Sequence, residues 1–240
     1  VRPIAQELDE KGEFPHELIK KMASLGLMGI PWGQEYGGIG MDTLALVIAI
    51  EELGKECCST AATLMAHTSL GTAPIALFGT TEQKEKYMPG LASGKKIGAF
   101  GLTEPNAGSD ASNTQTRAVV DGDYYIVNGE KSYCTNAGVS SSLIFTAVII
   151  QNDKKQDISA FIIESDTEGI SFNPPEKKMG WCASDTRSVF FKDMRIHKSA
   201  VLGNPKEGFK QFLQTLTSGR ITIGALSIGT AQGAFNKALL

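Results

Sequence analysis

Three separate segments of the chain combine hydroxyl, glycine and aromatic residues, the groups that can hold a polar or flat ligand. The first, Phe100 to Asp110, begins as an apolar strand and continues into a loop of small residues. Thr103 and Ser109 offer hydroxyls there, and Gly108 lets a ligand approach backbone N–H groups, an arrangement that anions prefer. The simpler interpretation is a strand that ends in a Pro-Asn turn, because such loops are common.

The second segment, 131–138, carries an aromatic ring two residues before a hydroxyl. Residues two apart on a strand share a face, so Tyr133 and Thr135 can contact one planar ligand. The alternative is a half-buried strand with Tyr133 in the core.

The third segment, 179–187, places four polar side chains after Trp181, which we expect to be exposed. This is more hydrogen-bonding capacity than a plain turn requires. The alternative is a solvated loop in which Asp185 and Arg187 form a weak surface pair. Further along, Arg220 fits either an anion clamp or a surface ion-pair partner. Each of these signals is weak alone.

The elements that must position these segments change character along the chain. Residues 1–94 read as helices, including one that begins after Asp42 and an amphipathic one over 81–92. Residues 95–202 read as short strands, with Asp121-Gly122 and Asn128-Gly129 both typical of hairpin turns. Residues 203–240 return to a helical period rich in small residues, which predicts close packing against another helix. The order predicts an α+β multidomain fold without βαβ alternation.

Composition excludes several classes of function. The 240 residues carry a formal net charge of -3, which argues against a nucleic-acid binder. No apolar run approaches the roughly 20 residues that a membrane helix needs. Four scattered cysteines and three scattered histidines show no metal-ligand spacing, so we predict no metal site. Neither a phosphate-binding loop motif nor a GxGxxG fingerprint is present.

Taken together and in order, the segments resemble the acyl-CoA dehydrogenases. Thr103–Asp110 resembles that family's TEPxAGSD signature, Tyr133–Asn136 its WITN segment, and Ala183–Arg187 its SDTR segment. The resemblance covers the whole chain. It implies an N-terminal helical domain (1–94), a middle antiparallel β-barrel (95–202) and the start of a C-terminal four-helix bundle (203–240).

The resemblance also implies residue roles. FAD would contact Phe100, Leu102, Thr103, Gly108, Ser109, Tyr133, Cys134 and Thr135, with the Thr135 hydroxyl near flavin N5. Acyl-CoA would contact Ser109, Ser184 and Arg220. Met65, Ala66 and Leu70 would border the acyl tail, although their sizes fix no chain length.

The implied reaction is α,β-desaturation of an acyl-CoA thioester. A carboxylate takes the α-proton while the β-hydrogen leaves as hydride to flavin N5, and electrons pass to an electron-transferring flavoprotein. Most family members use a Glu beyond the position of Leu240, and a minority use the residue before Arg220, which here is Gly219. We therefore expect the base beyond Leu240 and no desaturase activity from these 240 residues alone.

The family implies a tetramer or dimer, located in the cytoplasm of a prokaryote or the mitochondrial matrix of a eukaryote. Two alternatives stay open: an acyl-CoA oxidase, and a non-catalytic scaffold that binds acyl-CoA or flavin.

Overall fold

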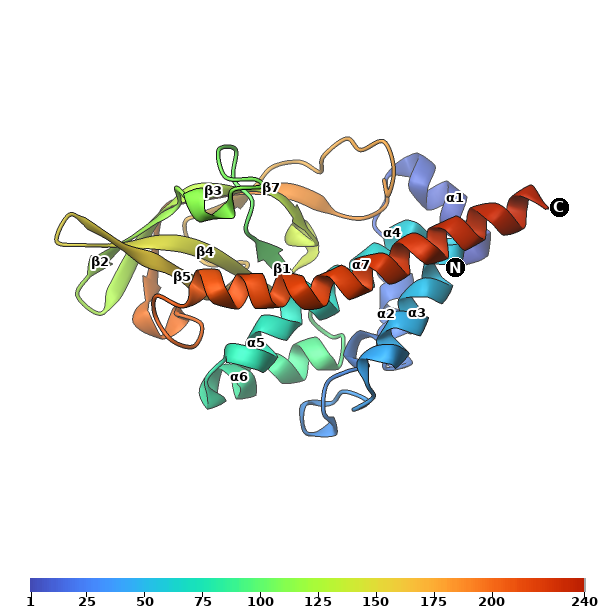
Figure 1. The fold of residues 1–240 in the computed structure, drawn as a ribbon, viewed down its shortest axis with the longest axis horizontal. Helices are drawn as coiled ribbons and strands as arrows, with labels where there is room; N and C mark the ends of the chain where they lie inside the picture. Colours follow the sequence, from blue (N-terminus) through green and yellow to red (C-terminus); the bar gives the residue numbers. More distant parts are fainter. Residues whose placement is uncertain (240) are drawn as a thin grey trace.

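The computed structural model describes residues 1–239. Its N-terminal part is helical (Figure 1). Asp42 accepts a hydrogen bond from the Ala45 N–H at 2.9 Å and caps the helix predicted after it. Thr80 and Gln83 form a reciprocal capping box at the start of the helix predicted over 81–92. Both predicted helices are confirmed. The helical elements are α1 (Arg2–Lys11), α2 (His16–Ser24), α3 (Thr43–Glu56), α4 (Cys58–Met65), a π-helical stretch (Ala66–Thr72), α5 (Ala73–Phe78) and α6 (Thr81–Ala92).

A seven-stranded sheet follows, in the order β1-β4-β2-β3-β7-β6 with β5 on β4. The strands of the predicted antiparallel barrel pair antiparallel at β2–β3, β3–β7, β4–β5 and β6–β7, but β1 and β2 both run parallel to β4. The β2–β3 hairpin lies between β1 and β4 in sequence, and a crossover of that length permits parallel pairing. The strands are β1 (Gly98–Gly101), β2 (Arg117–Asp121), β3 (Tyr124–Thr135), β4 (Ser142–Gln151), β5 (Lys154–Glu164), β6 (Ile170–Phe172) and β7 (Thr186–His197).

The two predicted turns differ in outcome. Asp121 pairs with Tyr124 across the β2–β3 hairpin, and Gly122 adopts φ 60°, so this turn is confirmed. The turn predicted at Asn128-Gly129 is wrong, since both residues lie inside β3. The pairing of β3 with β7 shifts register there, and Gly129 at φ 148° lies against Thr116, where a Cβ would meet the Thr116 hydroxyl at 2.6 Å. The glycine therefore serves a bulge rather than a turn.

Strand β4 is buried on both faces, which explains its unbroken apolar sequence. Leu143 and Phe145 face the core enclosed by the sheet, where Phe145 stacks on Phe191 with centroids 4.5 Å apart. Ile144 points the other way, into a second core shared with α5, α6 and Phe212. The sheet is thus anchored to the helices through its outer face.

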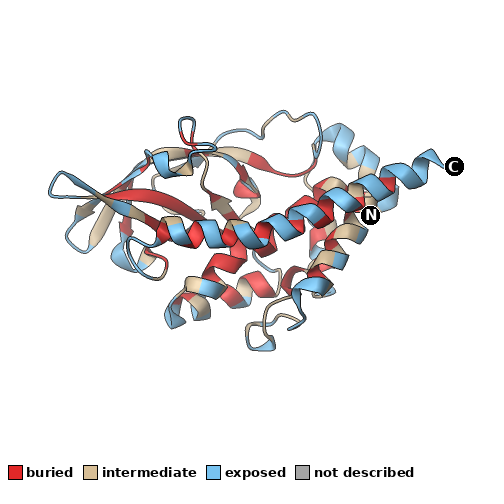
Figure 2. Cartoon of the chain, in the orientation of Figure 1, coloured by how far each residue is buried: buried red, intermediate tan, exposed pale blue. Residues whose placement is uncertain are grey.

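Helix α7 (Gly208–Ala238) crosses the molecule along α3 (Figures 1 and 2). A Cβ at Gly229 or Gly233 would collide with the backbone carbonyl of Glu51 or Lys55. The close helix contact predicted from the small residues is therefore confirmed, and it lies within this chain. On the opposite side Gly224 has open space around it.

No helix among residues 1–239 combines the length and apolar character that a membrane span requires. Within the same residues, no group of three or more His, Cys, Asp or Glu side chains is placed to hold a metal ion.

Candidate flavin and substrate site

A pocket of about 180 Å³ opens where the helices meet the ends of β1 and β3. Five residues predicted to contact a cofactor line it together. They are Phe100, Leu102, Thr103, Tyr133 and Thr135, joined by Ser132 from β3 and by Ala66, Leu70 and Leu216 from the helices. Two segments far apart in sequence thus form one site, and both threonines line the same cavity.

Tyr133 lies at an irregularity of β3 rather than on a regular strand. The pairing with β7 shifts between Lys131 and Cys134, and Tyr133 adopts φ 56°. A non-glycine residue rarely takes this conformation, which is strained and concentrates at functional sites. The side chain is 69% exposed, so the alternative that placed Tyr133 in the core is wrong. The ring stands at the pocket rim, free to contact a flat ligand.

The π-helical stretch supplies the helical side of the pocket through Ala66 and Leu70. Such stretches often occur at functional sites. Met65, predicted beside them, is buried in the N-terminal core instead.

The two pocket-lining segments are joined behind the pocket wall. The Ser132 N–H donates to the Thr103 carbonyl at 2.7 Å. Lys131 precedes Ser132 and Glu104 follows Thr103. Lys131 Nζ lies 2.6 Å from Glu104 Oε1, with side-chain exposures of 0% and 3%. Burial alone would raise the pKa of Glu104, but the Lys131 ammonium and the donated hydrogen bonds outweigh it and lower the pKa of this carboxyl. Burial lowers the pKa of Lys131, against the opposing effect of Glu104.

Other residues of the first two segments lie outside the pocket. Gly108 and Ser109 are exposed on the loop, and a Cβ at Gly108 would meet no atom within 4 Å. Cys134 is buried in the core of the sheet, where burial raises the pKa of its thiol to about 12. The Cys134 side chain therefore faces away from the cavity that Tyr133 and Thr135 line.

The third segment is exposed over 179–181, as a solvated loop would be, but buried over 183–186. Ser184 is buried and its hydroxyl donates to the Trp181 carbonyl at 3.0 Å, while Trp181 is 38% exposed. The buried Asp185 carboxylate accepts from the Gly138 N–H and from Arg187 Nε, both at 2.6 Å. Asp185 therefore holds the backbone at Gly138, in the turn that follows Thr135.

On α7, Arg220 is exposed and Gly219 is buried against Leu70, whose Cδ2 would lie 3.4 Å from a Cβ at that position. Position 219 thus faces the side chain that borders the pocket. The pocket lining contains no carboxylate among the described residues.

His67 is a structural residue of this site that the sequence did not single out. It is buried in the π-helical stretch, its Nε2 lies 3.1 Å from the Leu91 carbonyl, and its Nδ1 accepts from the Gly98 N–H at 3.1 Å. It therefore ties the helix behind the pocket to α6 and to the start of β1. Burial lowers the pKa of His67 to about 4, which keeps the ring neutral.

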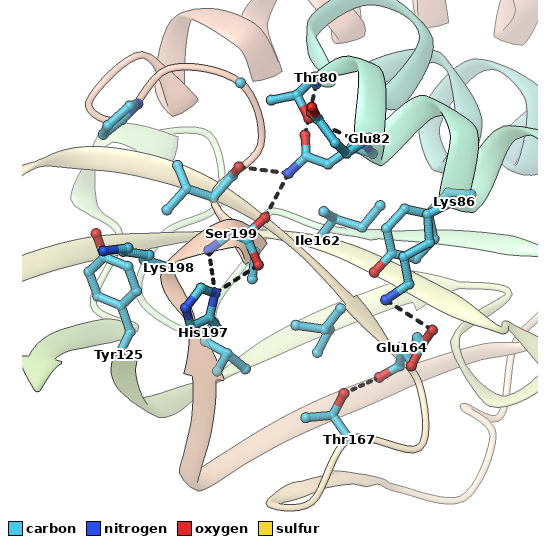
Figure 3. Close-up of a pocket in the computed structure, with 18 of the residues that line it drawn as sticks. Thr80, Glu82, Lys86, Tyr125, Ile162, Glu164, Thr167, His197, Lys198 and Ser199 are labelled. Carbon is cyan, nitrogen blue, oxygen red and sulfur yellow. Dashed lines mark hydrogen bonds and ion pairs between the residues drawn. The ribbon is translucent and has the colours of Figure 1, made fainter. Parts of the chain in front are cut away.

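A larger groove of about 810 Å³ lies between α6 and the ends of β5 and β7 (Figure 3). It contains none of the predicted site residues. Its lysines are paired with neighbouring acids, Lys86 with Glu164 at 3.3 Å and Lys198 with Asp123 at 2.6 Å. Gln83 crosses it to donate to the Ser199 and Val201 carbonyls. The contacts across this groove hold α6 against the sheet.

Two domain models of one known family match the chain. Residues 1–95 match the acyl-CoA dehydrogenase N-terminal domain, and residues 99–194 match the acyl-CoA dehydrogenase middle domain. The chain belongs to the acyl-CoA dehydrogenase family.

Individual relatives agree over the full length of this chain. It is 49% identical over 240 residues to a Bacillus subtilis protein named "Probable acyl-CoA dehydrogenase YngJ", covering 100% of this chain and 63% of the relative. It is 48% identical to a short-chain specific acyl-CoA dehydrogenase of Clostridium acetobutylicum, covering 99% of this chain and 63% of the relative. The chain thus spans less than two thirds of the length of these relatives.

Solved structures show the same architecture. The butyryl-CoA dehydrogenase of Megasphaera elsdenii superposes with a TM-score of 0.94 at 41% identity, covering 99% of this chain and 63% of that one. A chain from work on the electron transferring flavoprotein of Acidaminococcus fermentans also gives 0.94 at 41% identity, covering 100% and 63%. An acyl-CoA dehydrogenase of Bacillus anthracis complexed with FAD gives 0.90 at 38% identity, covering 96% and 40%.

Proposed function

We propose that the protein is an FAD-dependent acyl-CoA dehydrogenase that desaturates an acyl-CoA thioester between its α and β carbons. The observation that carries this proposal is the convergence of Thr103, Tyr133 and Thr135 on one pocket in a chain of this family. The FAD-bound Bacillus anthracis relative supports the choice of cofactor.

The pocket residues fit an isoalloxazine ring. The exposed Tyr133 side chain offers an aromatic face, and flat rings of this kind bind by stacking or edge contact. Thr103 and Thr135 would supply hydroxyls, and Phe100 and Leu102 add apolar side chains to the lining. The open space at Gly108 would let an anionic group approach the backbone of the loop, where N–H groups can bind it. Among the cofactor residues proposed from the family, Cys134 fits least, since its thiol faces the core.

Bound FAD would accept the hydride, and the chain would hold and orient the reacting groups. Thr135 would hydrogen-bond near flavin N5, and the apolar side chains of Ala66, Leu70 and Leu216 would exclude water around the acyl chain. Ser109 and Arg220, both exposed, would contact the coenzyme A part of the substrate. Ser184 would take part through its backbone or after a side-chain rotation, since its hydroxyl donates to Trp181 here.

Among residues 1–239, the pocket lining offers no carboxylate that could accept the proton. Glu104 is committed to Lys131 and to backbone N–H groups, and Gly219 has no side chain to offer. We infer that a carboxylate from outside these 240 residues takes the α-proton. The 240-residue chain alone should therefore show no desaturase turnover, and turnover from it would overturn this inference.

The family further supports transfer of electrons to an electron-transferring flavoprotein, consistent with the Acidaminococcus fermentans match. It also supports a tetramer or dimer, in the cytoplasm of a prokaryote or the mitochondrial matrix of a eukaryote. These assignments belong to the proposal.

The test is anaerobic titration of the whole, FAD-loaded protein with acyl-CoAs of several lengths. We expect bleaching of the oxidised flavin spectrum by one group of substrates and turnover with an artificial electron acceptor. Rapid oxygen consumption with peroxide release would instead indicate an acyl-CoA oxidase. A flavin spectrum unchanged by every acyl-CoA would refute the desaturase assignment and favour a binding scaffold.

A further inference from the structure

The Glu104–Lys131 pair connects the two sheet segments that line the pocket, the one after β1 and the one at the end of β3. Lys131 Nζ donates to Glu104 Oε1 at 2.6 Å, to Thr146 Oγ1 at 3.0 Å and to the Leu102 carbonyl at 3.3 Å. Leu102 itself lines the pocket, and so does Ser132, the residue after Lys131. A buried cation therefore lies directly behind the surface that would face the ligand.

The Glu104 carboxylate gathers the other end of the same loop. Its oxygens accept from the Gln115 N–H at 2.6 Å and from the Thr116 N–H at 3.1 Å. Residues 104 and 115–116 are the two ends of the loop that contains Gly108 and Ser109. One carboxylate thus fixes where this exposed loop leaves and rejoins the sheet.

We propose that Glu104 and Lys131 are a positioning pair for the flavin site: they hold the 102–116 loop against β3, and their opposite charges set the electron affinity of the bound flavin. This inference rests on the proposed function. Neither residue touches the cavity, so both act through Leu102, Thr103 and Ser132.

Stability alone does not account for the pair. Apolar residues of similar volume often replace a buried ion pair without loss, because removing two charges from water is costly. Here both charges are buried, and the low dielectric constant of the interior strengthens their electrostatic effect. Each charged residue is also adjacent in sequence to a residue that lines the pocket, Thr103 or Ser132. An unpaired charge beside the pocket would change the reduction potential of a bound ligand that gains electrons.

The two charges make opposite predictions, which a purely structural role would not. Lys131→Met leaves the buried Glu104 carboxylate without its cation and should make bound flavin harder to reduce. Glu104→Gln leaves the Lys131 ammonium facing neutral acceptors and should make it easier to reduce. The double variant removes both charges and should return the potential to near the wild-type value.

The experiment measures the flavin midpoint potential and the FAD dissociation constant of the whole protein and its variants. We expect the two single variants to shift the two-electron reduction equilibrium about tenfold in opposite directions, about 30 mV each. We expect all three variants to bind FAD about tenfold more weakly, because the loop is no longer held. Lys198→Met is the matched control, since Lys198 pairs with Asp123 at the same 2.6 Å but on the surface; it should change neither value.

Shifts of the same sign in both single variants, or no shift, would overturn the electrostatic part of the proposal. If the single variants fail to fold, the uncharged double variant decides: unchanged FAD affinity in it would show that the pair does not position the loop. Wild-type protein that binds no FAD would refute the proposed function itself, which separates that failure from a failure of this inference.

Discussion

Two lysine–carboxylate pairs of equal length differ in their burial and in the groups that they contact. Lys131–Glu104 and Lys198–Asp123 both measure 2.6 Å, but the first pair has side-chain exposures of 0% and 3% and the second 62% and 67%. The buried pair joins β3, β4 and the loop that follows β1 beside the candidate pocket, whereas the surface pair borders the groove of Figure 3. Burial and shared hydrogen-bond partners, rather than ion-pair distance, therefore decide which pair holds the backbone beside the pocket.

The sharpest way to test this contrast is to remove each lysine. Lys131→Met should lower the free energy of unfolding by about 3–5 kcal/mol, because it leaves a buried carboxylate without its cation. Lys198→Met should leave the urea midpoint unchanged within error, since solvent screens that pair. Equal effects of the two substitutions in urea denaturation would contradict the comparison.

Acid should act on the same buried region through His67. Its pKa is about 4 in the fold against about 6.5 unfolded, so the unfolded chain binds more protons between these values. Stability is therefore fully present above about pH 6.5 and falls as the pH drops towards 4, by about 3 kcal/mol. Denaturation at several pH values measures this.

His67→Gln should lower stability at neutral pH and reduce the slope between pH 6.5 and 4. The exposed His16→Gln is the control and should keep the slope. A slope unaffected by His67→Gln would show that other groups control the acid response.

Helix α7 extends the contrast between buried and exposed positions to glycine. Gly229→Ala should destabilise by about 1–3 kcal/mol, since the new methyl collides with the Glu51 carbonyl. Gly224→Ala, in open space on the same helix, should stabilise by about 0.5–1 kcal/mol through helix propensity. Thermal melts that show the same sign for both would contradict the packing of α7 on α3.

Local signals in the sequence predicted much of the fold. The helix over 81–92 was predictable because its capping residues and charged face are contiguous, and the Asp121-Gly122 hairpin because its turn residues are adjacent. The same logic failed at Asn128-Gly129, where the glycine accommodates Thr116, the residue before β2. Parallel pairing of β1 with β4 was not predictable, since no local pattern records which distant strand is adjacent.

The site divides in the same way. Family resemblance identified Thr103, Tyr133 and Thr135, and the structure brings them together. It did not indicate that Tyr133 adopts φ 56° or that Cys134 faces the core, because a bulge of β3 decides both. Glu104 and Lys131 lie 27 residues apart, and sequence spacing carries no sign of their contact.

We propose above that the pocket between β1, β3 and the π-helical stretch holds a flavin. The most direct measurement is the visible spectrum of the whole protein after refolding with excess FAD and removal of free cofactor, for the wild type and for Thr103→Val/Thr135→Val. The account predicts retained, protein-bound flavin in the wild type and weakened retention in the double variant. A colourless wild type, or equal retention by both proteins, would contradict it.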